Sequence, residues 1–291
     1  MILVVGATGQ LGGLIAQMLL DEGKQVRILV RPGTAYEPLV AAGAQAVTGD
    51  LKDPDSLVAA CAGVDTVVST ANSVGRGGED TVASVDDTGN ANLIEAAQSA
   101  GVRHFVFISA LGADAEHHVP FLKAKGQTEQ RLRASGMAWT VLQPNLFMDT
   151  WIPAVVGGPA LAGRPVTLVG QGKRRHSMIA ARDVASFAVS AIDRPEAQGQ
   201  TLFIGGPEPV SFRDAVSAFE REMGRELSVR TIEPGQSVPG LPEAVIPVLA
   251  GLDTNDTPLD MTQLTSQHGV RPTTLAEFVH SFVTASRPPG G

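Results

Sequence analysis

The sequence predicts an α/β fold, a doubly wound parallel sheet followed by a smaller C-terminal lobe. Two observations predict it. Short runs rich in Val and Ile alternate with helical stretches through the first half of the 291-residue chain, which is the pattern of a parallel sheet covered on both faces. In the second half the alternation loosens, and Pro and Gly cluster at 153–172 and 234–258. We therefore expect one domain over 1–150 and a lobe over 151–291, with a segment near 182–205 returning to the sheet.

Eight short apolar runs are predicted as strands. Those of the first half are continuous, as expected for strands that helices bury on both faces. The runs are ILVVG at 2–6, QVRILV at 25–30, AQAVTG at 44–49, DTVVST at 65–70, HFVFIS at 104–109, WTVLQP at 139–144, RPVTLV at 164–169 and QTLFIG at 200–205.

The intervening stretches carry apolar residues at helical spacing. One helix holds residues 92–100 and ends at Gly101, which suits a left-handed C-cap. Further helices are predicted at 181–192, 212–224 and 274–283. Leu11, Ile15, Met18 and Leu19 make the apolar stripe of the first helix, and Leu57, Val58 and Cys61 are placed on the next helix.

Composition and charge exclude several classes of partner. The formal net charge is −8 and no long run of basic residues occurs, whereas nucleic acid needs a basic face. No apolar run approaches the ~18 residues of a membrane span, and the opening MILVVGATG is interpreted as a strand and not as a signal peptide. Cys61 is the only cysteine, so we expect a buried, unreactive thiol and a reducing, cytoplasmic setting.

The segment GATGQLGG follows the first predicted strand and opens the first helix. Its glycines have a G-x-x-G-x-x-G spacing. Glycine lets the backbone turn tightly and approach a pyrophosphate, which then meets the N–H groups of the helix N-terminus. Because the loop lies between a strand and a helix, it predicts a Rossmann-type sheet that binds a dinucleotide. The expected contacts are Gly6, Thr8, Gly9, Gln10, Leu11 and Gly12.

The residue that ends the second strand bears on the choice between NADPH and NADH. Enzymes for NAD usually place an acid there to hold the ribose hydroxyls, but this chain has Arg31. Arginine suits a 2′-phosphate and can stack on adenine, so NADPH is preferred over NADH; the alternative is a solvated surface arginine. Further cofactor contacts are expected where the next two strands end, at Asp50, Leu51, Thr70, Ala71 and Asn72.

Several of these segments together resemble a known family. The stretches GATGQLGG, VRILVR, GDLKD, TGNANLIEAAQSAGVRHFVFISA and AKGQTEQRLRASGMAWTVLQPNLFMD resemble the atypical short-chain dehydrogenase/reductases, and the NmrA-like branch most of all. The later pieces ARDVA, GGPEPVSFRDA and GVRPTTLAEFV are similar to that branch too. The resemblance implies a Rossmann sheet, NAD(P) binding and a small substrate lobe. Homodimers through the helices of the sheet are common in the wider family.

The same resemblance implies a catalytic set of a serine, a tyrosine and a lysine four residues after the tyrosine. Ser109 ends the fifth strand and matches the serine, and Lys125 matches the lysine, which would bind the nicotinamide ribose. Counting back four residues gives Phe121, and Tyr36 is the only tyrosine in the chain. Phenylalanine has no proton to give, so ordinary ketone reduction is not expected.

Two neighbouring histidines are alternative proton donors. His117 and His118 lie in the loop ADAEHHVPF, which should face the nicotinamide. Histidine titrates near neutrality and could relay a proton, so His118 is a candidate catalytic residue and His117 a candidate substrate contact. The alternative is a pair of solvated loop histidines.

The segment after the sixth strand predicts further contacts. Large, adaptable side chains there suit an aromatic substrate, and ordinary core packing is the alternative. No metal-ligand spacing and no hydrolase elbow occurs, so no metal is expected. Predicted cofactor contacts are Pro144, Asn145, Leu146 and Phe147; predicted substrate contacts are Phe121, Phe147, Met148, Trp151 and His176.

Two functions remain open at this point. One is an NADPH-dependent reductase that transfers hydride to a small conjugated or aromatic substrate such as a quinone or an enone. The other is a dinucleotide-sensing regulator that acts through a protein partner without turnover, since the NmrA-like branch that the chain resembles includes such proteins.

Overall fold

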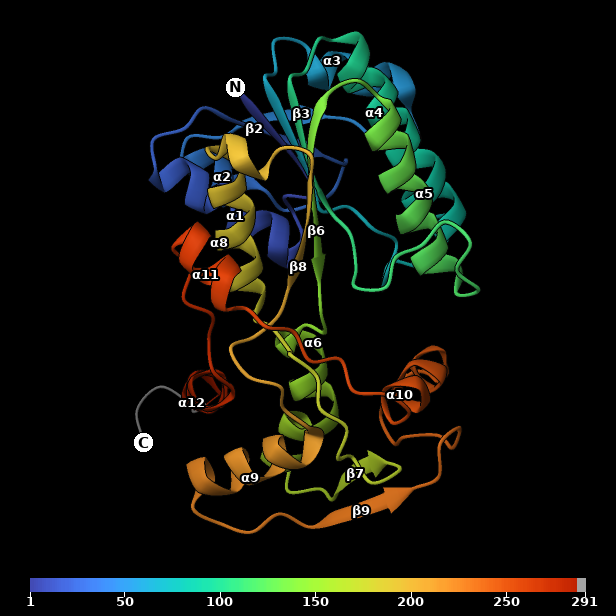
Figure 1. Ribbon diagram of the computed structural model, residues 1–291, viewed down its shortest axis with the longest axis vertical. Helices are drawn as coiled ribbons and strands as arrows, with labels where there is room; N and C mark the ends of the chain where they lie inside the picture. The colour runs from blue at the N-terminus through green and yellow to red at the C-terminus, as the bar shows by residue number, and fades with distance from the viewer. Residues whose placement is uncertain (287–291) are drawn as a thin grey trace. The chain divides into compact units, whose positions relative to one another are not determined.

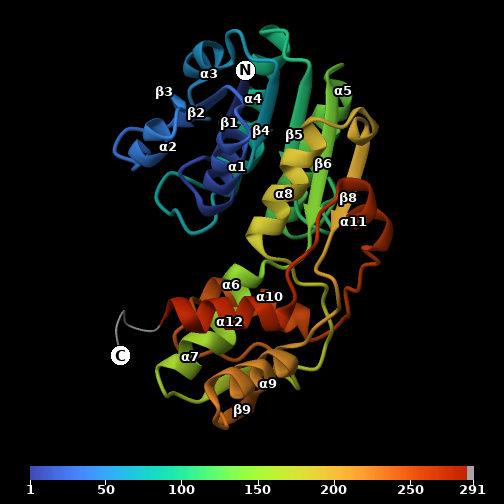
Figure 2. The ribbon, with the colours of Figure 1, turned by 90° about the vertical axis from the view of Figure 1, so that its left-hand side faces the viewer.

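The computed structural model describes residues 1–286. Within them, the strands of the first half and β8 from the second half build one sheet in the order β3-β2-β1-β4-β5-β6-β8, and each neighbouring pair from β3 to β6 is parallel (Figure 2). This is the doubly wound arrangement predicted from the sequence. Its strands are β1 Ile2–Val5, β2 Val26–Val30, β3 Gln45–Thr48, β4 Thr66–Ser69, β5 His104–Ile108, β6 Ala138–Pro144 and β8 Gln200–Ile204.

Helices cover both faces of the sheet (Figure 1). One face carries α1 Gln10–Asp21, α2 Glu37–Ala41 and α8 Ala181–Ile192; the other carries α3 Pro54–Cys61, α4 Asn90–Ser99 and α5 Pro120–Ala134, with the π-helix η1 Val82–Gly89 leading into α4. Because the strand order turns back between β1 and β4, the crevice for a dinucleotide is expected at the carboxyl ends of these two strands.

The predicted stripe of the first helix is buried in part: Ile15 and Leu19 on α1 are fully inaccessible, whereas Leu11 and Met18 are half-buried. On α3, Leu57 and Cys61 are fully inaccessible and Val58 is 59 % exposed. Burial raises the pKa of the Cys61 thiol to about 11, as suits an unreactive cysteine.

The chain forms two compact units. The sheet unit consists of Met1–Pro144, Val184–Phe203 and His268–Val270. The second unit consists of Asn145–Asp183, Ile204–Gln267 and the chain from Arg271 onward. The chain thus leaves the sheet unit after β6 and returns to it with most of α8 and β8.

The second unit has its own apolar core and a small parallel pair of strands, β7 with β9. The strand β9 was not predicted, and none of its residues is buried. Helices α9 and α12 each begin with a capping box and meet through the rings of Phe219 and Phe282. The helices and strands of the chain not yet given are α6 Met148–Ile152, η2 Pro153–Gly157, α7 Gly158–Leu161, β7 Val166–Val169, η3 Pro195–Ala197 (in the sheet unit), α9 Phe212–Met223, β9 Val229–Ile232, η4 Glu243–Val245, α10 Ile246–Leu252, α11 Thr262–His268 and α12 Leu275–Ala285.

Among residues 1–286, no helix combines the length and the apolar character that crossing a membrane requires.

Candidate cofactor and active site

The glycine loop brings α1 very close to the ends of β1 and β4. Gly6 has a φ of +90°, and a Cβ there would stand 2.5 Å from Thr70 Oγ1. A Cβ on Gly12 would overlap the carbonyl oxygen of Gly6. Both positions therefore require glycine, one for its positive φ and both for close packing. Gly9 precedes α1 without a side-chain cap, as expected for a helix start that receives a phosphate.

A pocket opens beside this loop at the carboxyl ends of β1 to β4. Predicted cofactor residues make up half of its lining. They are Gly6, Thr8, Arg31, Asp50, Leu51 and Ala71, and the sequence did not point to the others, Val5, Leu29, Gly49, Arg76, Asp80 and Val85. Apolar side chains form the inner wall, since Leu51 and Val85 are buried, and charged side chains form the rim. Such a pocket suits an adenosine with a charged substituent.

The charged rim is organised around Asp80. Arg31 Nη1 lies 2.5 Å from Asp80 Oδ2, and Lys52 Nζ lies 2.6 Å from Asp80 Oδ1. Arg76 Nη1 lies 3.6 Å from Oδ2. The cationic side chains are each about one third exposed, whereas the Asp80 side chain is only 9 % exposed.

The electrostatics follow from these contacts. The hydrogen bond from Lys52 and the pairing with Arg31 lower the pKa of Asp80 to about 2. In turn, the hydrogen bond to Asp80 raises the pKa of Lys52. Asp80 is therefore ionised, and the rim holds a second carboxylate, Asp50, whose Oδ2 lies 3.9 Å from Lys52 Nζ.

Sequence reasoning missed Lys52, Arg76 and Asp80. Lys52 directly follows the predicted pair Asp50 and Leu51, so it could have been included with them. Arg76 and Asp80 lie in the glycine-rich loop between β4 and η1. A glycine-rich loop that follows a strand of this sheet is a signal for ligand contact, and it was not used.

The other predicted cofactor residues of the sheet unit lie next to the pocket. Thr70 Oγ1 donates to the Val5 carbonyl oxygen at 3.2 Å, and Asn72 bonds its own loop through Thr70 O and Val74 N. Gln10 and Leu11 form the first turn of α1 with Gly12 behind them.

Ser109 lies in a buried polar cluster. Its hydroxyl donates to Glu129 Oε1 at 2.5 Å, and Gln143 Nε2 donates to the same oxygen at 2.9 Å. Arg133 pairs with the other oxygen, Oε2, at 2.8 Å. Ser109 is 5 % exposed and Glu129 is 2 % exposed. The serine hydroxyl is thus committed to a protein partner, and its role toward a cofactor stays a prediction.

Lys125 is buried in the same cluster, on helix α5, and is 2 % exposed. Its ammonium donates to the Ile108 carbonyl oxygen at 3.1 Å and lies over the rings of Phe107 and Phe121, at 4.8 and 5.5 Å from their centres. Burial lowers the pKa of Lys125, while the carboxylates of Asp86 and Glu129 oppose this effect. Its expected contact with a nicotinamide ribose also stays a prediction.

Asp86 supplies the counter-charge to Lys125. It is fully inaccessible, and its Oδ2 accepts from the Ser73 backbone N–H at 3.0 Å and the Ser73 hydroxyl at 2.6 Å. Its Oδ1 lies 4.0 Å from Lys125 Nζ and accepts no hydrogen bond in the described part of the chain. Asp86 could not be selected from the sequence, because nothing in its spacing marks it as buried.

The candidate proton donors lie before and at the start of α5. His117 and His118 stack at 4.5 Å between ring centres, and the backbone N–H of Val119 donates to His117 Nδ1. His118 is exposed and His117 is half-buried. Phe121 is the second residue of α5, so its ring reaches the Lys125 ammonium one turn later. Within residues 1–286, no hydrogen bond, ion pair or ring contact joins either histidine to Ser109 or Lys125, and the histidines therefore stay candidates.

Residues 144–147 span the boundary between the units. Pro144 ends β6, and Asn145 begins the second unit. The Asn145 amide nitrogen donates to the carbonyl oxygen and the hydroxyl of Thr257, so this side chain is already engaged. Leu146 and Phe147 are half-buried.

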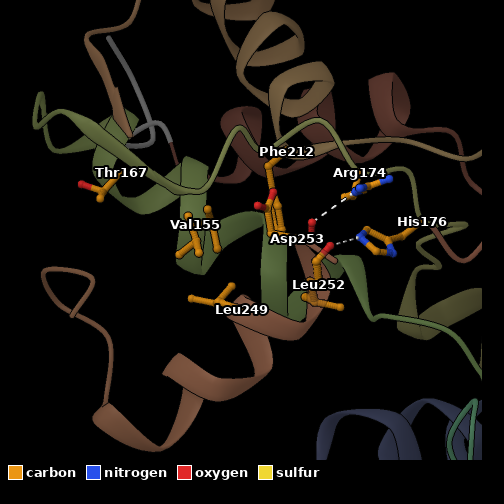
Figure 3. Close-up of a pocket in the computed structure, with 10 residues that line it drawn as sticks. Val155, Thr167, Arg174, His176, Phe212, Leu249, Leu252 and Asp253 are labelled. Atoms are coloured by element: carbon orange, nitrogen blue, oxygen red, sulfur yellow. Dashed lines mark hydrogen bonds between the residues drawn. The ribbon is translucent and has the colours of Figure 1, made fainter. Parts of the chain in front are cut away.

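The predicted substrate residues of the second unit are packed to different degrees. Met148 is 1 % exposed and belongs to the apolar core, whereas Trp151 is half-buried against it. His176 is 1 % exposed; Nε2 bonds the Leu252 carbonyl oxygen and Nδ1 bonds the Thr257 hydroxyl. Burial lowers its pKa. Figure 3 shows His176 directed at the end of α10 beside Arg174, in a small pocket that lies wholly in this unit.

The sheet order, the glycine loop and the charged pocket define a Rossmann-type dinucleotide-binding protein. The chain belongs to the NAD(P)H-binding family, which matches residues 6–195. This finding bears out the resemblance to the atypical short-chain dehydrogenase/reductases of the NmrA-like branch.

Three relatives illustrate the range of this similarity. An NAD(P)H azoreductase of Xenophilus azovorans is 34 % identical over 227 residues, which cover 78 % of this chain and 75 % of the relative. The photosystem II assembly factor Ycf39 of Trieres chinensis is 30 % identical over 237 residues, covering 79 % and 72 %. The solved triphenylmethane reductase of Citrobacter sp., complexed with NADP(H), superposes with a TM-score of 0.82 at 23 % identity, covering 97 % of this chain and all of the other; it shows the shared fold.

Proposed function

We propose that this protein is an NADPH-dependent oxidoreductase that transfers hydride to a small conjugated or aromatic substrate, such as a quinone, an enone or an azo compound. The observation that carries the proposal is the pocket beside the glycine loop, which Arg31 and Arg76 line and where Lys52 shares the Asp80 carboxylate with them; these cations would suit a 2′-phosphate. The 34 % identity to an NAD(P)H azoreductase supports the reaction class.

The choice of substrate class follows from the residue at position 121. When bound, NADPH supplies a hydride, and the acceptor takes up one further proton. A simple ketone would become a strongly basic alkoxide, for which general acid assistance is worth ~10²–10⁴ in rate. Phe121 has no proton to give. A quinone, an enone or an azo group delocalises the new negative charge, so water can supply the proton after hydride transfer.

The chain's own residues would then mainly bind and orient. Arg31, Lys52 and Arg76 would hold the phosphate, and the glycine loop would hold the pyrophosphate. Ser109 and Lys125 lie in the interior between β5 and α5, so their expected effect is to fix the end of β5 beside the nicotinamide. His118 is exposed before α5 and is the candidate for proton relay.

One experiment tests the proposal directly. The purified protein is incubated with NADPH and, separately, with NADH, against a panel of azo dyes, quinones, enones and simple ketones, and oxidation of the nicotinamide is followed. We expect turnover with conjugated acceptors and NADPH, and little with ketones. Tight NADPH binding without turnover of any acceptor would overturn the reductase proposal.

A second function is favoured by one observation. The hydroxyl of Ser109 and the ammonium of Lys125 are both engaged inside the protein, an arrangement that also suits a dinucleotide sensor without turnover. The 30 % identity to an assembly factor of Trieres chinensis is consistent with such a role. Tight NADPH binding without turnover would support it, with the ligand altering association with a protein partner.

A further inference from the structure

The loop between β4 and η1 contributes both a cation and a carboxylate to the pocket where we expect the adenosine end of the dinucleotide to bind. Arg76 and Asp80 both line that pocket, and Asp80 stands between the cations that come from the ends of β2 and β3. Three glycines in this loop, Gly75, Gly77 and Gly78, have positive φ, and a Cβ on any of them would meet nothing within 4 Å. The loop therefore needs these glycines for their positive φ and not for close packing.

The carboxylate of Asp80 provides these cations with negatively charged acceptor oxygens, as a phosphate would. Each oxygen takes one close cation, Oδ2 from Arg31 at 2.5 Å and Oδ1 from Lys52 at 2.6 Å. Arg76 approaches Oδ2 at 3.6 Å. A phosphomonoester carries about −1.5 to −2 charges at neutral pH and has three acceptor oxygens. It can therefore replace a carboxylate, with its single charge and two oxygens, among the same cations.

We propose that Asp80 is an internal competitor for the 2′-phosphate of NADPH, so that binding exchanges the carboxylate for the phosphate on Arg31 and Lys52. This inference rests on the proposed use of NADPH and names the residue that sets its selectivity. Asp80 lowers the affinity for NADPH relative to a pocket without it. NADH has no 2′-phosphate that could compete with Asp80, so the ion pairs of Asp80 with Arg31 and Lys52 stay intact when NADH binds.

A different role for Asp80 would have the opposite consequence. A carboxylate in this pocket could accept hydrogen bonds from the ribose hydroxyls of NADH, as the acid at the end of the second strand does in NAD enzymes. Asp80 would then favour NADH directly. Removing its charge separates the two roles, because competition predicts tighter NADPH binding and ribose recognition predicts weaker NADH binding.

The test compares Asp80→Asn with the parent protein and with Glu79→Gln. Glu79 is exposed in the same loop, so its replacement removes one negative charge without removing a partner of Arg31. Dissociation constants are measured by calorimetry for NADPH, NADH and adenosine 2′,5′-bisphosphate at low and moderate salt. Melting temperatures check that each variant is folded, and Asp80→Ala serves as a second variant.

We expect Asp80→Asn to tighten NADPH and the bisphosphate about tenfold, to change NADH less than about twofold, and to steepen the salt dependence of NADPH binding. Glu79→Gln should change each constant less than about twofold. Unchanged or weaker NADPH binding in both Asp80 variants, or weaker NADH binding, would overturn the proposal. A parent protein that prefers NADH would overturn the proposed cofactor itself, which is a separate result.

Discussion

Two charged clusters in the sheet unit have opposite arrangements of charge. Around Asp80, one carboxylate faces the cations Arg31, Lys52 and Arg76 at the wall of a pocket. Around Lys125, one ammonium lies near the carboxylates of Asp86 and Glu129 in the interior. The cations of the first cluster are about one third exposed, whereas Lys125 is 2 % exposed.

Charged groups at the wall of a pocket can serve ligand binding, whereas charged groups in the interior serve structure. A ligand can exchange with Asp80, because its partners reach solvent and a phosphate can satisfy them. No solute can exchange with Asp86, which is fully inaccessible. Buried ion pairs are weak evidence for stability, but removing one partner is strongly destabilising because it leaves an uncompensated charge. The predictions below test this contrast.

The largest effect is expected from Lys125→Met. The substitution keeps an apolar stem but leaves the fully inaccessible carboxylate of Asp86 without its cation. We expect the free energy of unfolding to fall by about 3–5 kcal/mol, measured by urea denaturation. Lys123→Met on the same helix is the matched control and should cost less than ~0.5 kcal/mol. Equal losses of unfolding free energy in the two variants would mean that Lys125 and its buried partners contribute no more to stability than Lys123 does.

Arg31→Ala should have the next largest effect, and on binding. Hydrogen bonds to charged groups are worth ~1.5–3 kcal/mol, so NADPH should bind about 10- to 100-fold more weakly while NADH changes little. Calorimetric titration of both cofactors gives the ratio. If NADPH and NADH weaken equally, Arg31 supports the adenosine and does not read the phosphate.

The smallest effect is expected from pH on the Asp80 pairs. The pKa of Asp80 is about 2 in the folded protein, below the ~3.9 of an unfolded aspartate. Between these values the unfolded chain binds more protons, so the stability that Asp80 contributes is fully present above pH ~4–5 and is lost as pH falls toward 2. The gap in melting temperature between the parent and Asp80→Asn should therefore narrow from pH 7 to pH 3.5. A gap that stays constant would show that the contribution of Asp80 is not electrostatic.

The sequence was sufficient for much of the fold and for half of the pocket. Strand runs and helical stripes are local and periodic, so β1 to β6 and β8 could be located directly. Gly6 and Gly12 could be selected because their spacing encodes a turn and a close contact. The predicted stripe of α1 is only half-buried at Leu11 and Met18, since periodicity gives the centre of a buried face better than its edge.

The strands of the sheet, the glycine loop and the arginine after β2 could be predicted, because each depends on residues adjacent in the chain. Which charges meet depends on how the chain folds. Asp80 lies 49 residues from Arg31 and 28 from Lys52, and its position depends on the path of a glycine-rich loop that follows no period. Only the tertiary structure, likewise, placed Lys125 in the interior, because burial results from how a helix packs on its sheet and not from the spacing that identifies the lysine.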